Sequence, residues 1–129
     1  MSSIFSKIIA GEIPCHKIAE NDKFLAFLDI MPLAKGHTLV IPKIAVDYFF
    51  DLPEDYLSEI NAFAKDVASQ LRRAVPCKKV GVTIIGLEVP HAHVHLIPIN
   101  GVADMNFEKP KMIVSNDELS ALAEKIRQA

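Results

Sequence analysis

The stretch His91-Ala92-His93-Val94-His95-Leu96-Ile97-Pro98 places three of the five histidines of the chain at every second position. Because side chains alternate between the two faces of a β-strand, this spacing predicts a strand with all three imidazoles on one face. The apolar residues between them would line the other face and pack into a core. Imidazoles titrate near neutral pH, so three aligned on one strand favour a catalytic or binding site, with a solvated histidine face as the alternative.

Hydrophobic periodicity and turn residues predict four further strands and three helices around this stretch. We expect Gly11 to end the first helix, Asp51 to cap the second with Glu54 in a capping box, and Ser115 to start the third with Glu118. The expected strands are 15–20, 24–30, 37–41 and 80–85, and the first two helices are 2–10 and 51–73.

The order of these elements indicates the fold class. Strands come first, a long helix follows, and further strands precede a terminal helix, which is typical of an α+β fold with a mostly antiparallel sheet. Short turns between the first strands support antiparallel pairing. The long helix repeats apolar residues every three or four positions, which predicts one buried stripe made of Leu57, Ile60, Ala64, Val67 and Leu71.

Composition narrows the class of protein. The chain has 129 residues, 50% hydrophobic and 23% charged, which suits one globular domain. The net charge of −2 and the lack of a basic run argue against long nucleic acid as a partner. Cys15 and Cys77 form no CxxC motif, and we expect two reduced thiols. No apolar run is long enough for a membrane span or a signal core, so we expect a cytoplasmic location and no membrane partner.

Several segments together resemble the histidine-triad (HIT) family of nucleotide hydrolases and transferases, and its Hint-like branch in particular. The stretch 91–97 is similar to the family signature His-φ-His-φ-His-φ-φ, where φ is apolar, and segments 4–14, 25–32 and 36–43 resemble other family segments in the expected order. The resemblance implies a five-stranded antiparallel sheet with helices on one side, including one long helix and a C-terminal helix. It implies one domain over residues 1–129, with a core at about 4–98 and a C-terminal extension at about 99–129.

The resemblance also implies a reaction at the α-phosphate of a purine nucleotide. His93 would attack the phosphorus of a nucleoside phosphoramidate or dinucleoside polyphosphate and form a covalent nucleotidyl-histidine, which water then hydrolyses. His95 would bind a phosphate oxygen or protonate the leaving group, and His91 and His37 would orient the other two. The expected protein is a hydrolase or nucleotidyl transferase that works as a homodimer without a cofactor. The alternative is a nucleotide-binding or protein-interaction module with little or no catalysis.

In relatives, the nucleoside lies between the N-terminal segment and the second strand. Asp29 would accept hydrogen bonds from the ribose, and backbone near Val89 would reach the phosphate. The residues expected to contact the base, for which ordinary core packing is the alternative, are Ile4, Phe5, Ile8, Phe27 and Ile30.

The chain departs from the family pattern at two places. The segment 82–90 before the triad is shortened, has Leu87 where relatives carry Gln, and lacks their Asn, so two polar phosphate contacts are missing or replaced, with Thr83 as an alternative to the Asn. Relatives with structural zinc use two cysteines and a histidine where this chain has Ser3, Ser6 and Ala45. Hydroxyl and methyl groups are poor zinc ligands, so we expect no structural zinc. A metal site on the histidine strand itself is the remaining alternative.

Overall fold

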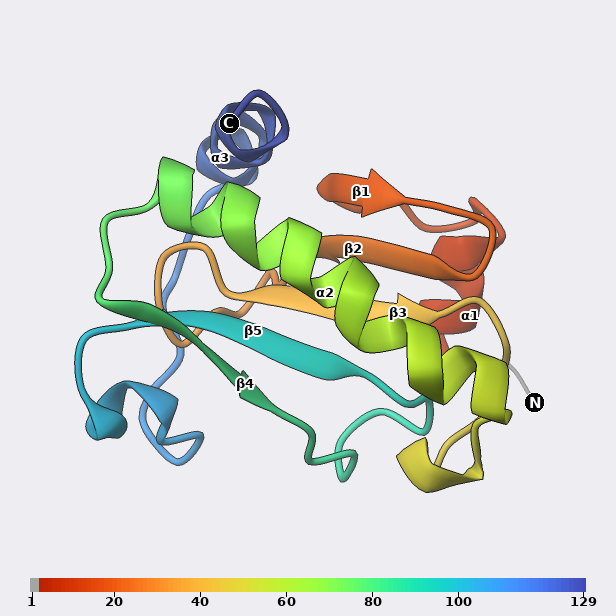
Figure 1. Cartoon of the computed structure of the whole chain (residues 1–129). Coiled ribbons are helices and arrows are strands. Elements are labelled where there is room, and N and C mark those ends of the chain that lie inside the picture. Colours follow the sequence, from red (N-terminus) through yellow and green to blue (C-terminus); the bar gives the residue numbers. More distant parts are fainter. Residues whose placement is uncertain (1–2) are drawn as a thin grey trace.

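The computed structural model describes residues 3–129 and contains an antiparallel sheet of five strands in the order β1-β2-β3-β5-β4 (Figure 1). Each strand pairs with its neighbours in antiparallel register. The fold class expected from the sequence is therefore confirmed. The strands are β1 (Lys17–Glu20), β2 (Phe24–Leu28), β3 (Thr38–Pro42), β4 (Lys79–Thr83) and β5 (Val94–Ile99).

Helices cover both faces of the sheet, so the expectation of helices on one side is wrong. The long helices α2 (Glu54–Ala74) and α3 (Asn116–Arg127) pack on one face, and the short helix α1 (Ile4–Ile9) packs on the other (Figure 1). Two 3₁₀ turns, η1 (Phe49–Asp51) and η2 (Val102–Met105), lie in the connections. None of the helices within residues 3–129 combines the length and apolar composition that crossing a bilayer requires.

Strand alternation divides the buried residues into two clusters. In β2 all five residues are buried because both faces of this strand are covered. Phe24, Ala26 and Leu28 join the larger cluster beneath α2 and α3, whereas Leu25 and Phe27 join a smaller one beneath α1. The predicted α2 stripe packs into the larger cluster, with Leu57 only half-buried and the other four residues buried.

The helix termini match the sequence in two cases out of three. Ser3 caps α1 by accepting from the Ser6 N–H at 3.1 Å, and Ser115 caps α3 by accepting from the Glu118 N–H at 3.1 Å. Gly11 follows α1 with φ +80°, as expected, while Ser2 lies outside the described residues. The Asp51 cap is wrong. Asp51 ends η1, and α2 begins after Pro53, whose fixed φ suits a helix start.

Strand limits differ by a few residues from those expected, and the differences have local causes. β1 begins at Lys17 rather than at residue 15, and β4 ends at Thr83 rather than at residue 85. β2 ends at Leu28 because the Asp29 carboxylate accepts from the Met31 N–H at 2.9 Å and turns the chain. β3 runs one residue later than expected, and only the second half of the histidine stretch is strand, from Val94 onward.

Gly36 precedes β3 in a conformation that other residues rarely adopt, with φ +90°. A Cβ placed there would lie 3.1 Å from Pro98 Cγ and 3.1 Å from Val75 Cγ2. The next residue, His37, is buried. The tight contact at Gly36 therefore fixes where the chain enters β3 and brings His37 into the interior.

We expect Gly36→Ala to lower the free energy of unfolding by about 2–4 kcal/mol, because strain and crowding add at this position. Urea denaturation would measure the change. Gly11→Ala, at positive φ but with no atom within 4 Å of the added Cβ, should lose about 1 kcal/mol, and Gly101→Ala, in extended backbone and open space, should stay within about 0.5 kcal/mol. Equal losses in all three variants would contradict this reading of Gly36.

Candidate active site

His93 presents an unprotonated nitrogen because a backbone carbonyl fixes its tautomer. Nδ1 of His93 lies 2.7 Å from the carbonyl oxygen of His91. A carbonyl only accepts hydrogen bonds, so Nδ1 carries the proton and donates. The lone pair of the neutral ring is therefore on Nε2. His93 is buried, with 5% of the residue exposed.

His95 presents the opposite group, an N–H, because a second chain of hydrogen bonds fixes its proton. The Leu33 N–H donates to His37 Nδ1 at 3.0 Å, which leaves the proton of His37 on Nε2. That Nε2–H donates to His95 Nδ1 at 2.9 Å, so His95 carries its proton on Nε2. The ring centroids of His93 and His95 are 4.9 Å apart. The two histidines thus place an acceptor nitrogen beside a donor nitrogen.

His91 holds the backbone that orients His93. Its Nε2–H donates to the carbonyl of Pro42 at 2.9 Å, and its Nδ1 accepts from the Ser3 hydroxyl at 3.3 Å. His91 and His93 both precede β5, so the expected strand over the whole histidine stretch is wrong. β3 ends at Pro42, which has no N–H with which to extend the ladder, and the His91 side chain bonds to its carbonyl instead.

Burial favours the neutral forms of His37, His91 and His95. It lowers the pKa of His37 to about 4, with smaller electrostatic contributions from Lys111 and His93. Burial, with smaller electrostatic contributions from His37, His93 and Lys111, lowers the pKa of His95 to about 3, and burial also lowers that of His91. His95 is therefore neutral at pH 7 in the free protein. Burial has the opposite effect on the carboxyl of Asp29, whose pKa it raises.

The apolar cluster beneath α1 lies against these histidines. The Phe5 ring packs edge-on against Phe27, His91 and His93, with centroid distances of 5.7, 5.9 and 5.1 Å. Ile8 and Val89 pack against the same cluster. Phe5 and Phe27 are also buried core residues, so the base-binding and core interpretations both apply to them. Ile4 and Ile30 are exposed, at 47% and 62%.

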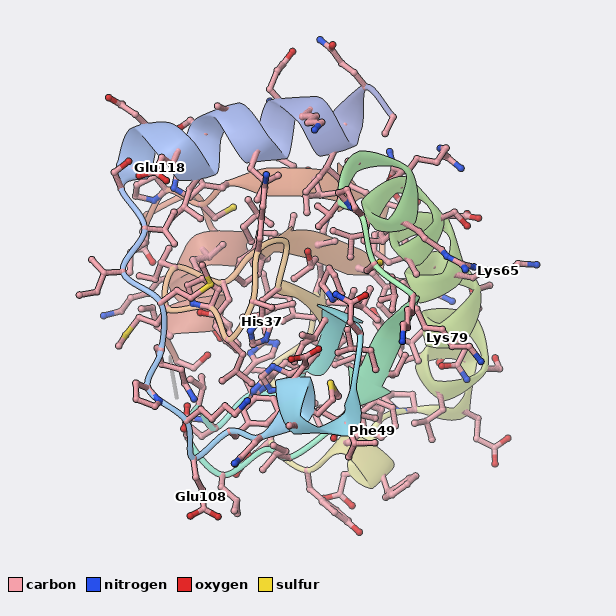
Figure 2. All side chains as sticks on the ribbon, turned by 90° about the vertical axis from the view of Figure 1, so that its left-hand side faces the viewer. His37, Phe49, Lys65, Lys79, Glu108 and Glu118 are labelled. Carbon is pink, nitrogen blue, oxygen red and sulfur yellow. The ribbon has the colours of Figure 1, made fainter. Side chains whose placement is uncertain are left out.

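Asp29 lies beside His37 at the end of β2. Its Oδ2 lies 3.7 Å from His37 Nε2, and its backbone N–H donates to the carbonyl of His37 at 2.9 Å. Asp29 and His37 also line a cavity of about 390 Å³ between α3 and the loop 31–36, whose lining does not include His93 or His95. Figure 2 shows His37 within a group of nitrogen-bearing side chains near the centre of the molecule.

Three of these residues could also hold a metal ion. Asp29, His37 and His95 each offer one ligand atom, and these atoms lie within 4.8 Å of one another. Carboxylate and imidazole suit zinc and similar ions. An ion there would have to replace the proton that His37 shares with His95. The positions expected to lack structural zinc lie elsewhere, where the hydroxyls of Ser3 and Ser6 are 3.4 Å apart beside His91; that expectation stays a prediction.

Sequence reasoning missed two residues at this site. Phe107 and Lys111 belong to the segment between β5 and α3, and the Phe107 ring packs 4.8 Å from that of His95 and 6.0 Å from that of His37. Neither residue belongs to a recognisable motif. The only available signal was a single aromatic residue, Phe107, in a mostly polar connection. Such a residue does not show which other part of the chain it contacts.

The fold and the paired histidines define a domain of the histidine-triad type. The model of the HIT domain matches residues 10–101, and the chain belongs to this family. The chain is 37% identical to the adenosine 5'-monophosphoramidase hnt1 of Schizosaccharomyces pombe, over 98% of this chain and 96% of the relative. A HIT-like protein of Bartonella henselae matches with TM-score 0.86 and 31% identity, covering 98% of this chain and 95% of the other. A zinc-bound histidine-triad protein of Mycobacterium smegmatis matches with TM-score 0.81 and 28% identity, covering 99% and 92%.

The lowered pKa values of His37 and His95 predict a loss of stability in mild acid. Each imidazole binds a proton more weakly in the folded chain than in the unfolded chain, where its pKa is near 6.5. The contribution of both groups to the free energy of unfolding is therefore fully present above pH 6.5. It is lost as the pH falls toward 4, by up to about 1.4 kcal/mol per pH unit for each histidine. The raised pKa of Asp29 opposes part of this loss.

Urea denaturation of the wild type between pH 7 and 4 would measure this slope. The double variant His37→Asn/His95→Asn should show a clearly shallower slope, whereas His16→Asn, which changes a half-buried histidine bonded to Ser120, should keep that of the wild type. A double variant with an unchanged slope would mean that other groups control acid stability.

Proposed function

We propose that this chain is a purine-nucleotide hydrolase or nucleotidyl transferase that works through a covalent nucleotidyl-histidine on His93. One observation carries the proposal: the unprotonated Nε2 of His93, set by the His91 carbonyl, lies beside the N–H of His95, set by the Leu33 N–H acting through His37. The likeness to the S. pombe adenosine 5'-monophosphoramidase supports adenosine phosphoramidates as a substrate class, with dinucleoside polyphosphates as the other class to test.

The reaction would proceed in two displacements at the α-phosphorus. In the first, His93 Nε2 forms the bond to phosphorus while the bond to the leaving oxygen or nitrogen breaks. The negative charge of a bound phosphate favours uptake of one proton by the hydrogen-bonded pair of His37 and His95, and the Nε2 proton of His95 then passes to the leaving group. In the second, water attacks the phosphorus, the nitrogen–phosphorus bond breaks, and His95 takes up the proton of the water. The products are a nucleoside monophosphate and the free enzyme.

The surrounding residues would bind and orient the nucleotide. Phe5 and Phe27, which pack edge-on and are buried next to His93, would form the inner apolar wall of a purine site. The Asp29 carboxylate would accept hydrogen bonds from the ribose hydroxyls. Ile4 and Ile30 would supply exposed apolar surface at the rim of the base site. His91 and His37 would act as positioning residues, since each fixes a proton or carbonyl that a reacting histidine needs.

His93→Ala should abolish both turnover of an adenosine phosphoramidate and the AMP adduct that mass spectrometry detects on the quenched protein. The expected fall in kcat/KM is at least about 10³-fold, because the covalent route is lost altogether. His16→Ala is the matched control. His16 immediately precedes β1 and is not one of the histidines of the site, so this variant should leave activity unchanged. Activity that survives His93→Ala would refute the mechanism.

The alternative, a binding module with little catalysis, is favoured by the loop before the triad. Leu87 is 87% exposed and offers no hydrogen-bond donor from its side chain. Such a module would bind AMP in a manner that depends on Phe27 and Asp29 while turnover stays at background. Calorimetry with AMP alongside the turnover assay separates the two functions.

We also propose that the chain forms a homodimer through the edge of the sheet at β4. This strand has one neighbour within the sheet, and an unpaired edge strand favours association. The adjoining surface exposes a group of apolar side chains, and part of it encloses a cavity of about 450 Å³ between the loop 47–50 and the loop 84–87. These exposed residues are Tyr48, Phe50, Val82, Ile84, Ile85 and Leu87.

Val82→Asp should shift the protein from dimer to monomer in sedimentation velocity, because it places a charge within this apolar surface. Ile113→Asp is the control. Its side chain is fully exposed on the segment before α3, so the variant should remain dimeric. A wild type that sediments as a monomer, or a dimer that Val82→Asp leaves intact, would refute the proposed interface.

A further inference from the structure

The segment between β5 and α3 closes one side of the catalytic histidines. It is held at both ends: Asp104 accepts from the N–H groups of Asn100 and Gly101, at 2.7 and 3.1 Å, and the Met112 N–H donates to the carbonyl of Pro32 at 2.8 Å. Figure 2 shows this segment running from η2 past Glu108 and along one side of His37 toward α3. The segment is thus a fixed part of the wall of the site.

Phe107 and Lys111 are the residues of this segment that approach the site. The Phe107 ring meets the His95 ring edge-on, at a centroid distance of 4.8 Å and an interplanar angle of 70°. Lys111 Nζ lies 5.3 Å from the centre of the Phe107 ring and donates to the Phe107 carbonyl at 2.8 Å. Phe107 therefore holds the lysine ammonium on the His95 side of the site, which is the side of the leaving group.

The positive charge of Lys111 reaches the reacting groups. It adds to burial in lowering the pKa values of His37 and His95, and it opposes the burial that raises the pKa of Asp29. Within residues 3–129, no carboxylate lies within 4.0 Å of its Nζ. The ammonium thus has one carbonyl partner and further donor capacity.

The loop before the triad cannot supply this charge. Its apolar residues Ile84, Ile85 and Leu87 are exposed, and its one charged residue, Glu88, is an anion that raises the pKa of Asp29. Apart from the histidines themselves, Lys111 is the only cationic side chain among the groups that influence the pKa values of Asp29, His37 and His95 within the described residues. A lysine is a compact point charge on a flexible stem and suits a phosphate group that must enter and leave.

We propose that Lys111 binds the anionic leaving group of the substrate, in place of the side-chain donors that the shortened loop lacks. The preferred substrate is then a nucleotide with further phosphates beyond the α-phosphate, such as a dinucleoside polyphosphate, rather than one that releases a neutral amine. This inference rests on the proposed function, because His95 defines the leaving-group side. Phe107 is a positioning residue for the lysine ammonium.

Kinetics with two substrates and three variants test the proposal. Lys111→Met should lower kcat/KM for a diadenosine polyphosphate on the order of 10- to 100-fold, mainly through KM, and change that for adenosine phosphoramidate by less than about threefold. Lys111→Arg should restore most of the lost activity. Lys109→Met, an exposed lysine of the same segment, should match the wild type. Equal losses for both substrates, or no loss for either, would overturn the proposal.

Equilibrium binding distinguishes this proposal from the proposed function. By calorimetry, the wild type should bind ADP more tightly than AMP, and Lys111→Met should lose that preference while its affinity for adenosine is unchanged. This result would support the assignment of Lys111 even in a protein without turnover, in which case only the catalytic function would fail. A wild type that binds AMP and ADP equally would overturn the role of Lys111, and one that binds no nucleotide would overturn both proposals.

Discussion

The candidate site depends on hydrogen bonds between the backbone and imidazole rings. Neutral histidine has two tautomers, and only one of them leaves the required nitrogen free on each ring. The carbonyl of His91 selects that tautomer for His93, and the N–H of Leu33, acting through His37, selects it for His95. These partners come from the segment before β5 and from the loop before β3. The loop and the antiparallel sheet are therefore both needed to fix the tautomers of His93 and His95.

Burial and charge act together on this arrangement. The same desolvation that keeps His37 and His95 neutral also makes their hydrogen bonds stronger than they would be in water. Neutral rings do not repel one another, so the buried imidazoles of His37, His91 and His95 can share a small volume. An incoming phosphate would then be the largest charge in the site, and the protein's response to it would be carried by Lys111 and by protonation of His95.

Much of the fold could be predicted from the sequence because local patterns determined it. The α2 stripe, the Ser115 cap and the antiparallel strands all follow from periodicity and turn chemistry. The second layer formed by α1 was missed, since six residues carry too little pattern to show which face of a sheet they cover. The Asp51 cap failed because Pro53, two residues on, decides where the helix starts.

For the site, the alternation of the histidines predicted that they lie together, as the rings of His93 and His95 do, although the strand begins only at Val94. The pairing of His37 with His95 joins residues 58 positions apart, and the approach of Phe107 to His95 joins residues 12 positions apart. No local rule encodes those contacts. The family resemblance predicted that His37 belongs near the triad, and the residues of the connection before α3 had neither a motif nor a family pattern to reveal them.

The burial of both faces of β2 has a consequence for how such a protein can change over time. Positions 24, 26 and 28 face the large cluster under α2 and α3, while positions 25 and 27 face the side of α1 and the triad. Substitutions at the even positions act on the core beneath the long helices, whereas those at the odd positions act on the apolar layer that packs against the imidazole rings. Adjacent codons in this short strand therefore affect separate packing layers, so a change on the triad side can alter the surroundings of the histidines while the core under α2 and α3 stays as it is.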